Sequence, residues 1–144
     1  MADFKLSKEE EKEIIEAIRS AEGQTSGEIR VHIQKTLALP VYQEAAKVFL
    51  QLGMHKTERR NGVLLFIVPS KRQFAILGDT GINQVVPENF WEDCKNSIHD
   101  YFSKGQFCAG ICDTLSKIGI KLAHFFPVSN DDINELNDEI TFSE

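Results

Sequence analysis

The chain has 144 residues and a formal net charge of −6, with 42% hydrophobic and 26% charged residues. This size and composition are typical of one globular domain with a single core. The negative charge argues against a nucleic-acid partner, since binding to a phosphate backbone needs a basic surface. The longest apolar run, residues 63–68, is too short to span a membrane.

Two features favour a cytoplasmic location. The first residues run into a Glu-rich segment and contain neither the apolar core nor the cleavage site of a signal peptide. The three cysteines, an odd number, indicate reduced thiols rather than a disulfide framework. We therefore expect a cytoplasmic protein.

The first half of the chain predicts a helix, a strand and a second helix. Ser7 and Glu10 have the spacing of a capping box, and the apolar stripe that follows predicts a helix over residues 8–21. Residues 28–34 alternate between apolar and polar side chains, which is typical of a strand. A further apolar stripe predicts a helix over residues 42–52.

The second half predicts a pair of strands followed by two helices. Residues 63–68 and 73–78 are apolar runs joined by a short polar turn, which indicates an antiparallel hairpin. An amphipathic helix begins after residues 87–89, and a core-facing apolar seam predicts another helix over residues 107–126. Residues 128–144 then form an acidic C-terminal tail without Lys or Arg.

This order of elements predicts an α/β fold, a three-layer αβα sandwich with a small mixed central sheet of about four strands. The helix over residues 42–52 connects two strands, and such a crossover favours parallel pairing between them. We therefore expect a single domain over residues 1–127, followed by the acidic tail over residues 128–144.

The loop after the last predicted strand, Gly78-Asp79-Thr80-Gly81, is the most informative segment for function. Glycines let the backbone turn sharply and approach a ligand closely, and loops at strand ends commonly bind ligands in α/β proteins. The loop therefore predicts the place of a site, and the reaction that occurs there stays open.

Carboxylates near this loop form the predicted metal site, and they are Glu28, Asp79, Glu88, Glu92 and Asp93. Hard cations take oxygen ligands from carboxylates, carbonyls and water, so we expect a divalent cation, with Ca²⁺ first and Mg²⁺ or Zn²⁺ as alternatives. The competing interpretation is structural. Acids in the first turn of a helix complement its dipole, and Asn89 with Glu92 has the spacing of a capping box.

Four segments, in this order, resemble the TPM domain: SGEIRV at residues 26–31, RNGVLL at 60–65, ILGDTGI at 76–82 and FSKGQF at 102–107. The TPM domain occurs in thylakoid-lumen proteins linked to photosystem II repair and in many bacterial proteins. The resemblance implies an αβα sandwich. It also implies an acid phosphatase activity, described for plant members, and divalent-metal or calcium sites near the strand-end loops.

The strand-end loop departs from the family pattern. Many members have Gly-x-Gly-Leu-Glu followed by an aspartate, whereas here Asn83 stands where the acidic residue is expected and Glu88 lies near the later aspartate. Under the resemblance, an inherited metal site would be shifted, and Asp79 would supply the missing charge.

Three functions remain open at this point. The first is a divalent-cation site whose loops, once ordered, modulate the surface offered to a protein partner. The second is a metal-dependent acid phosphatase, in which Arg59, Arg60 or Arg72 would hold the phosphate and the cation would activate water. The third is a metal-free interaction module.

Other chemistry has little support in the sequence. The sequence lacks the Gly-x-Ser-x-Gly nucleophile motif, the phosphate-binding P-loop and a His pair with zinc spacing. Cys94 and Cys108 are predicted to be core residues. In the metal-free module, Phe90, Trp91 and Tyr101 could lie on an exposed patch rather than in the core.

Overall fold

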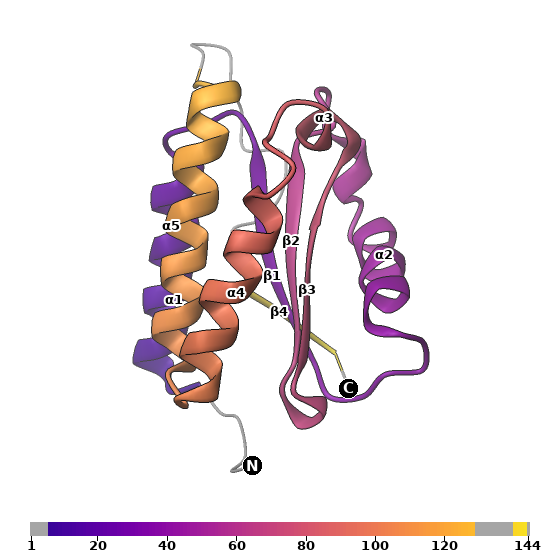
Figure 1. Cartoon of the computed structure of the whole chain (residues 1–144), viewed down its shortest axis with the longest axis vertical. Coiled ribbons are helices and arrows are strands. Elements are labelled where there is room, and N and C mark those ends of the chain that lie inside the picture. Colours follow the sequence, from indigo (N-terminus) through magenta and orange to yellow (C-terminus); the bar gives the residue numbers. More distant parts are fainter. Residues whose placement is uncertain (1–5, 129–139, 144) are drawn as a thin grey trace.

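One mixed sheet lies between two layers of helices in the computed structural model, which describes residues 6–128 and 140–143 (Figure 1). This arrangement confirms the predicted three-layer αβα sandwich with a small mixed sheet. One face of the sheet carries a single helix, α2 (Val41–Gln51). The other face carries α1 (Lys8–Glu22), α4 (Phe90–Ser103) and α5 (Phe107–Phe125).

The strand order in the sheet is β3-β2-β1-β4. The strands are β1 (Glu28–Gln34), β2 (Gly62–Val68), β3 (Gln73–Gly78) and β4 (Ile140–Ser143). As predicted, β1 and β2 are parallel across the α2 crossover, and β2 and β3 form an antiparallel hairpin. The fourth strand, β4, pairs in parallel with the other edge of β1.

The chain-order prediction did not include β4, which lies within residues 128–144. Ile140 pairs with Val31 and packs against the main core, so at least this part of the segment belongs to the fold. The strand has only four residues and depends on a partner more than a hundred positions away, which local periodicity does not reveal. The acidic residues 129–139 lie outside the described residues.

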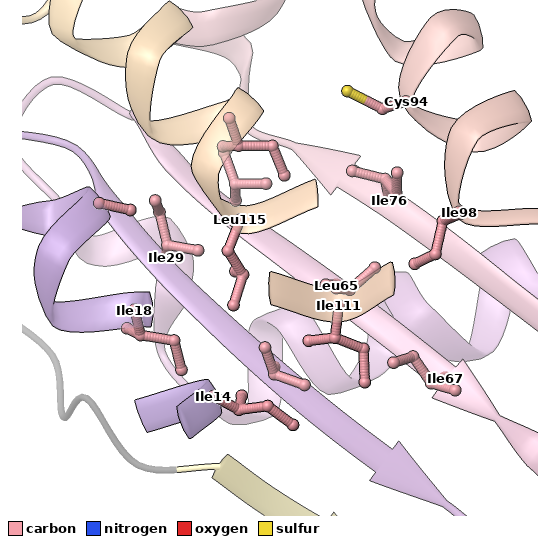
Figure 2. Close-up of a cluster of buried hydrophobic side chains, with 14 of the residues drawn as sticks. Ile14, Ile18, Ile29, Leu65, Ile67, Ile76, Cys94, Ile98, Ile111 and Leu115 are labelled. Atoms are coloured by element: carbon pink, nitrogen blue, oxygen red, sulfur yellow. The ribbon is translucent and has the colours of Figure 1, made fainter. Parts of the chain in front are cut away.

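Apolar clusters fill both faces of the sheet. The larger cluster lies under α1, α4 and α5 and includes Ile18, Leu65 and Ile111 (Figure 2). The smaller cluster lies under α2 and includes Phe49 and Phe66. Every residue of β2 is buried, because this central strand contributes side chains to both clusters.

Short helical segments connect the main elements: η1 (Met54–Lys56), η2 (Pro69–Lys71) and α3 (Thr80–Asn83). The predicted strand-end loop therefore continues directly into α3, with Asp79 as its N-cap. Across residues 6–128 and 140–143, no helix combines the length and the hydrophobicity that crossing a membrane requires.

One of the two predicted capping boxes is present. Ser7 Oγ accepts from the Glu10 amide at 3.1 Å, and Glu10 Oε1 accepts from the Ser7 amide at 3.0 Å. The capping box predicted for Asn89 and Glu92 is wrong, because Asn89 already has helical backbone angles (φ −85°, ψ −2°) and its side chain caps no amide. Asn89 Nδ2 instead donates to Asp93 at 3.3 Å.

The α2-facing side of β1 carries a buried polar row that includes His32 and Gln34. Gln34 Nε2 donates to Glu44 Oε1 at 3.1 Å, so Gln34 Oε1 is the acceptor for His32 Nε2 at 3.2 Å. His32 Nδ1 then accepts from the Thr141 hydroxyl of β4 at 2.6 Å. Burial lowers the pKa of His32 below its ordinary value, and the charge of Arg30 lowers it further.

Two glycines pack the segment after β3 closely against its neighbours. A Cβ atom added at Gly81 would lie 2.1 Å from the carbonyl oxygen of Arg59 and 2.7 Å from that of Arg60. A Cβ atom at Gly78 would lie 2.6 Å from the ring of Trp91. Side chains at these positions would therefore push the segment away from both the loop before β2 and the start of α4.

We expect acid to destabilise the fold partly through His32. The unfolded chain binds a proton at this residue below about pH 6.5, whereas the folded protein, with its lowered pKa, resists protonation. The contribution of neutral His32 to the stability of the folded protein is therefore complete above that pH and is lost as the pH falls. In urea unfolding at about pH 7.5 and about pH 5.5, His32→Gln should lose less stability on acidification than the wild type. His99→Gln, at an exposed position, should behave like the wild type, and equal acid sensitivity of all three proteins would contradict the assignment.

Gly81→Ala should destabilise the protein by about 3 kcal/mol, because the added methyl group collides with backbone that side-chain motion cannot relieve. Gly105→Ala is the control. That position has a positive φ of 73° but no atom within 4 Å of an added Cβ, so only the conformational cost of about 1 kcal/mol applies. Urea unfolding measures both losses, and equal values would show that the contact at Gly81 is unimportant.

Candidate functional site

Glu28, Gly62 and Asp79 lie side by side at one end of the sheet. Glu28 pairs with Gly62 in the register of β1 and β2, and the Asp79 amide donates to the Gly62 carbonyl at 3.0 Å. Two strand spacings place the α carbons of Glu28 and Asp79 about 10 Å apart. Glu28 is 3% exposed and Asp79 is 6% exposed. The structure therefore places two of the five predicted ligands at one end of the sheet, where both are buried.

The alternation of side chains places this row on the α2-facing side of the sheet. Leu77, two residues before Asp79, packs in the cluster under α2, and paired residues of neighbouring strands share a face. A Cβ atom added at Gly62 would lie 3.1 Å from the Met54 carbonyl oxygen. The edge thus combines carboxylate and carbonyl oxygens, which hard cations prefer as ligands.

Arg60 binds both carboxylate oxygens of Asp79. Its Nε donates to Oδ2 at 2.7 Å and its Nη2 donates to Oδ1 at 2.8 Å, and this hydrogen bonding raises the pKa of Arg60 above its ordinary value. The Thr80 amide donates to the same Oδ1 at 2.7 Å, which caps α3. The Asp79 side chain is 4% exposed, whereas that of Arg60 is 48% exposed.

The backbone before β2 holds Arg60 in place. Arg60 has a left-handed conformation (φ 52°), its amide donates to the Thr57 carbonyl at 3.2 Å, and its carbonyl accepts from Gly81 at 2.9 Å. The Asn61 amide donates to the buried Thr57 hydroxyl at 3.2 Å. Sequence reasoning named Arg60 only as a phosphate-binding candidate, because nothing local signals an ion pair across 19 positions.

The other three predicted ligands lie at the exposed beginning of α4. Glu92 forms an ion pair with Lys95 at 3.7 Å, and Asp93 accepts from Asn89. Glu88 precedes the helix and is exposed. Within the part of the chain that the structure describes, no group of three or more His, Cys, Asp and Glu side chains is arranged to hold a metal ion. The five carboxylates are thus not gathered into one cluster, and their role as ligands stays a prediction.

Asn83, at the position where the family pattern predicts an acid, links α3 to the end of β3 and to the start of α4. Its Nδ2 donates to the Gly78 carbonyl at 2.8 Å, and its Oδ1 accepts from the Trp91 indole at 3.0 Å. An ionised aspartate could accept from the indole but could not donate to Gly78, so the amide suits this position better.

The aromatic residues of α4 are half-buried rather than exposed. Phe90 and Trp91 pack against the main core, and their ring centroids lie 5.0 Å apart. Tyr101 is also half-buried. The open aromatic patch that a metal-free interaction module would require is therefore absent at these three residues.

Nucleophilic chemistry has little support among the described residues. Burial raises the pKa of Cys94 to about 11 and that of Cys108 to about 12, so both thiols are protonated at neutral pH. Lys117 Nζ lies 2.8 Å from Ser97 Oγ, but its hydrogen bond to Asp113 raises the Lys117 pKa. This lysine therefore stays charged and cannot take a proton from Ser97.

Comparison with solved structures supports the same fold. The chain is similar to the BA42 protein from the psychrophilic bacterium Bizionia argentinensis, solved by NMR, with 44% identity and a TM-score of 0.91 over 99% of this chain and 98% of that one. The N-terminal domain of cg2496 from Corynebacterium glutamicum shares 13% identity over 97% of this chain and 80% of that one, with a TM-score of 0.65. An N-terminal domain from P. gingivalis shares 20% identity over 84% of this chain and 78% of that one, with a TM-score of 0.66.

A search of curated proteins gives no match. The family model of the TPM domain, in contrast, matches residues 4–120, which include β1, β2, β3 and the row formed by Glu28, Gly62 and Asp79. The four segments whose order resembled that domain all lie within this match. The chain therefore belongs to the TPM domain family.

Proposed function

We propose that the buried end of the sheet around Gly62 binds a divalent cation, with Asp79 and Glu28 as direct ligands and Ca²⁺ as the first candidate. The observation that carries this proposal is the placement of two buried carboxylates on either side of one glycine, on the same face of the sheet. Arg60 balances the charge of Asp79 in this structure, and a divalent cation would take over that role while also binding Glu28.

The donor atoms at this edge favour an oxygen-preferring cation. The carboxylates and the carbonyl oxygen of Met54 are the ligands that Ca²⁺ and Mg²⁺ take, whereas Zn²⁺ prefers nitrogen and sulfur. Ca²⁺ tolerates irregular geometry and Mg²⁺ demands an octahedron, so a row of ligands across a sheet edge suits Ca²⁺ better. Water would complete the coordination. Glu88, Glu92 and Asp93 remain further predicted ligands.

The role we propose for the cation is regulatory. Asp79 connects the end of β3 to α3, and the loop before β2 packs directly against α3 through Gly81. A cation bound to Asp79 would act on all of these segments together, because their positions depend on one another. The result would be a different surface for a protein partner at this end of the sheet.

A metal-dependent acid phosphatase is the second candidate. Arg59 and Arg60 lie at the same edge as the two carboxylates, and Arg59 Nη1 lies 3.5 Å from Ser26 Oγ. Guanidinium groups bind phosphate oxygens, and a neighbouring cation would supply Lewis-acid activation of water. Hydrolysis of p-nitrophenyl phosphate that requires the cation, stops with EDTA and is lost in Asp79→Asn would support this activity.

Asp79→Asn should weaken Ca²⁺ binding by about tenfold or more, because an amide oxygen replaces a carboxylate ligand. Calorimetric titration of EDTA-stripped protein measures this change. Asp113→Asn is the matched control, because it also removes a carboxylate from an ion pair, that with Lys117 at 3.0 Å, on the surface of α5. Its affinity should equal that of the wild type. Unchanged affinity in Asp79→Asn would remove Asp79 from the site, and the absence of binding by the wild type would refute the proposal.

Variants of the remaining carboxylates define the ligand set. Glu28→Gln should also weaken binding by about tenfold, since it removes the second carboxylate of the row. The triple variant Glu88→Gln, Glu92→Gln, Asp93→Asn removes three exposed charges near the start of α4. An effect as large as that of Glu28→Gln would make these residues ligands, whereas a small effect would restrict the site to the row.

A further inference from the structure

We propose that Arg60 is a built-in competitor of the cation, which it replaces at Asp79 in the cation-free protein. On cation binding, Arg60 leaves Asp79 and its guanidinium group binds a phosphoryl anion beside the bound ion. This inference rests on the cation site proposed above. It adds the order of events, cation first and anion second, and the chemical class of the second ligand.

The hydrogen bonds of Asp79 require such an exchange. Oδ1 already accepts from both Thr80 and Arg60, and Oδ2 accepts from Arg60. A carboxylate in a bidentate pair with arginine cannot also offer both oxygens to an ion, because the two positive groups would occupy the same positions. A cation that uses Asp79 as a bidentate ligand must therefore displace the guanidinium group.

The difference in exposure identifies the partner that moves. The Asp79 side chain is buried and is also held by the Thr80 amide at the beginning of α3. The Arg60 side chain is about half exposed, so its guanidinium group can turn into water without opening the core. Water replaces the hydrogen bonds of the departing guanidinium group, whereas the buried Asp79 carboxylate needs the cation as its new partner.

The backbone keeps the displaced arginine near the site. Arg60 is anchored by hydrogen bonds to Thr57 at 3.2 Å and Gly81 at 2.9 Å, and neither involves its side chain. The guanidinium group thus remains within one side-chain length of Asp79. Its planar array of donors matches the oxygens of a phosphoryl group, and a divalent cation next to it would attract the same anion.

The first test compares the cation affinity of the wild type with those of two Arg60 variants. By calorimetry, Arg60→Gln should bind Mg²⁺ and Ca²⁺ at least about fivefold more tightly, because the competitor is gone. Arg60→Lys keeps the charge but cannot bond to both oxygens, so its affinity should also rise. A general charge effect would instead leave Arg60→Lys equal to the wild type.

Arg72→Gln is the matched control for these variants. Arg72, which the sequence also offered as a phosphate-binding candidate, has a left-handed backbone (φ 54°) as well. It lies in the turn at the opposite end of β2 and β3 and is therefore outside this site. Its removal changes the net charge equally and should leave cation affinity unchanged. The Nε–Hε signal of Arg60 in ¹⁵N–¹H NMR should shift on cation saturation in the wild type, and the amide spectrum shows whether each variant is folded.

The second test measures binding of phenylphosphonate, a phosphoryl anion that cannot be hydrolysed. Saturating Ca²⁺ should raise its affinity for the wild type by about tenfold or more, and the two ligands should enhance each other equally. Arg60→Gln should lose most of this enhancement although it binds Ca²⁺ more tightly. These opposite effects of one substitution separate an exchanging arginine from one that only stabilises the loop.

The outcomes distinguish this inference from the proposed function. If the wild type binds the cation, unchanged affinity in Arg60→Gln and an unmoved Nε–Hε signal would overturn the competition and leave the cation site intact. Unchanged phenylphosphonate affinity in Arg60→Gln at saturating Ca²⁺ would overturn the anion step alone. Absence of cation binding in the wild type and in Arg60→Gln would overturn both proposals, whereas binding only by Arg60→Gln would support the competition.

Discussion

The ion pair between Asp79 and Arg60 is the interaction on which the candidate site at this end of the sheet depends. Asp79 follows β3, caps α3 and neutralises a guanidinium group with one buried carboxylate. The same contact closes the loop before β2 onto α3, where Gly81 leaves no room for a side chain. Because one carboxylate serves both segments, a change in its partner is transmitted to both. Gly81 allows the two backbones to approach closely, and its amide donates to the Arg60 carbonyl at 2.9 Å.

Contacts elsewhere in the fold protect the two edges of the sheet. β4 covers β1 at the end opposite to Glu28, where Thr141 supplies the hydrogen bond that the buried His32 needs. At the other edge, the Lys95 Nζ atom of α4 lies 5.0 Å from the ring centroid of Tyr42 in α2, so side chains of helices on opposite faces of the sheet are in contact. Exposed strand edges invite pairing with other chains, and a cation–π contact across the edge opposes it.

Local chemistry determined which parts of this structure were predictable. The apolar period of α1, the Ser7 capping box and the hairpin of β2 and β3 are encoded by neighbouring residues, and the structure confirms them. The four-residue β4 exists only because β1 offers a partner, and the Asp79–Arg60 pair forms only after β2 and β3 are aligned. Sequence reasoning used the glycines to predict where a site would lie, but the pairing of Arg60 with Asp79 depends on tertiary contacts.

The pairing of Arg60 with Asp79 would also determine how a cation site at this end of the sheet responds to cation concentration. A competitor within the same chain is present at a fixed effective concentration, so it lowers the apparent cation affinity by the fraction of molecules in which Asp79 is occupied. The intrinsic affinity of the carboxylates is unchanged. Such a site would bind little cation at low concentration and would free the half-exposed guanidinium group from Asp79 only when the cation is bound. The Asp79–Arg60 pair would thereby couple the position of the loops to the binding of ligands of opposite charge.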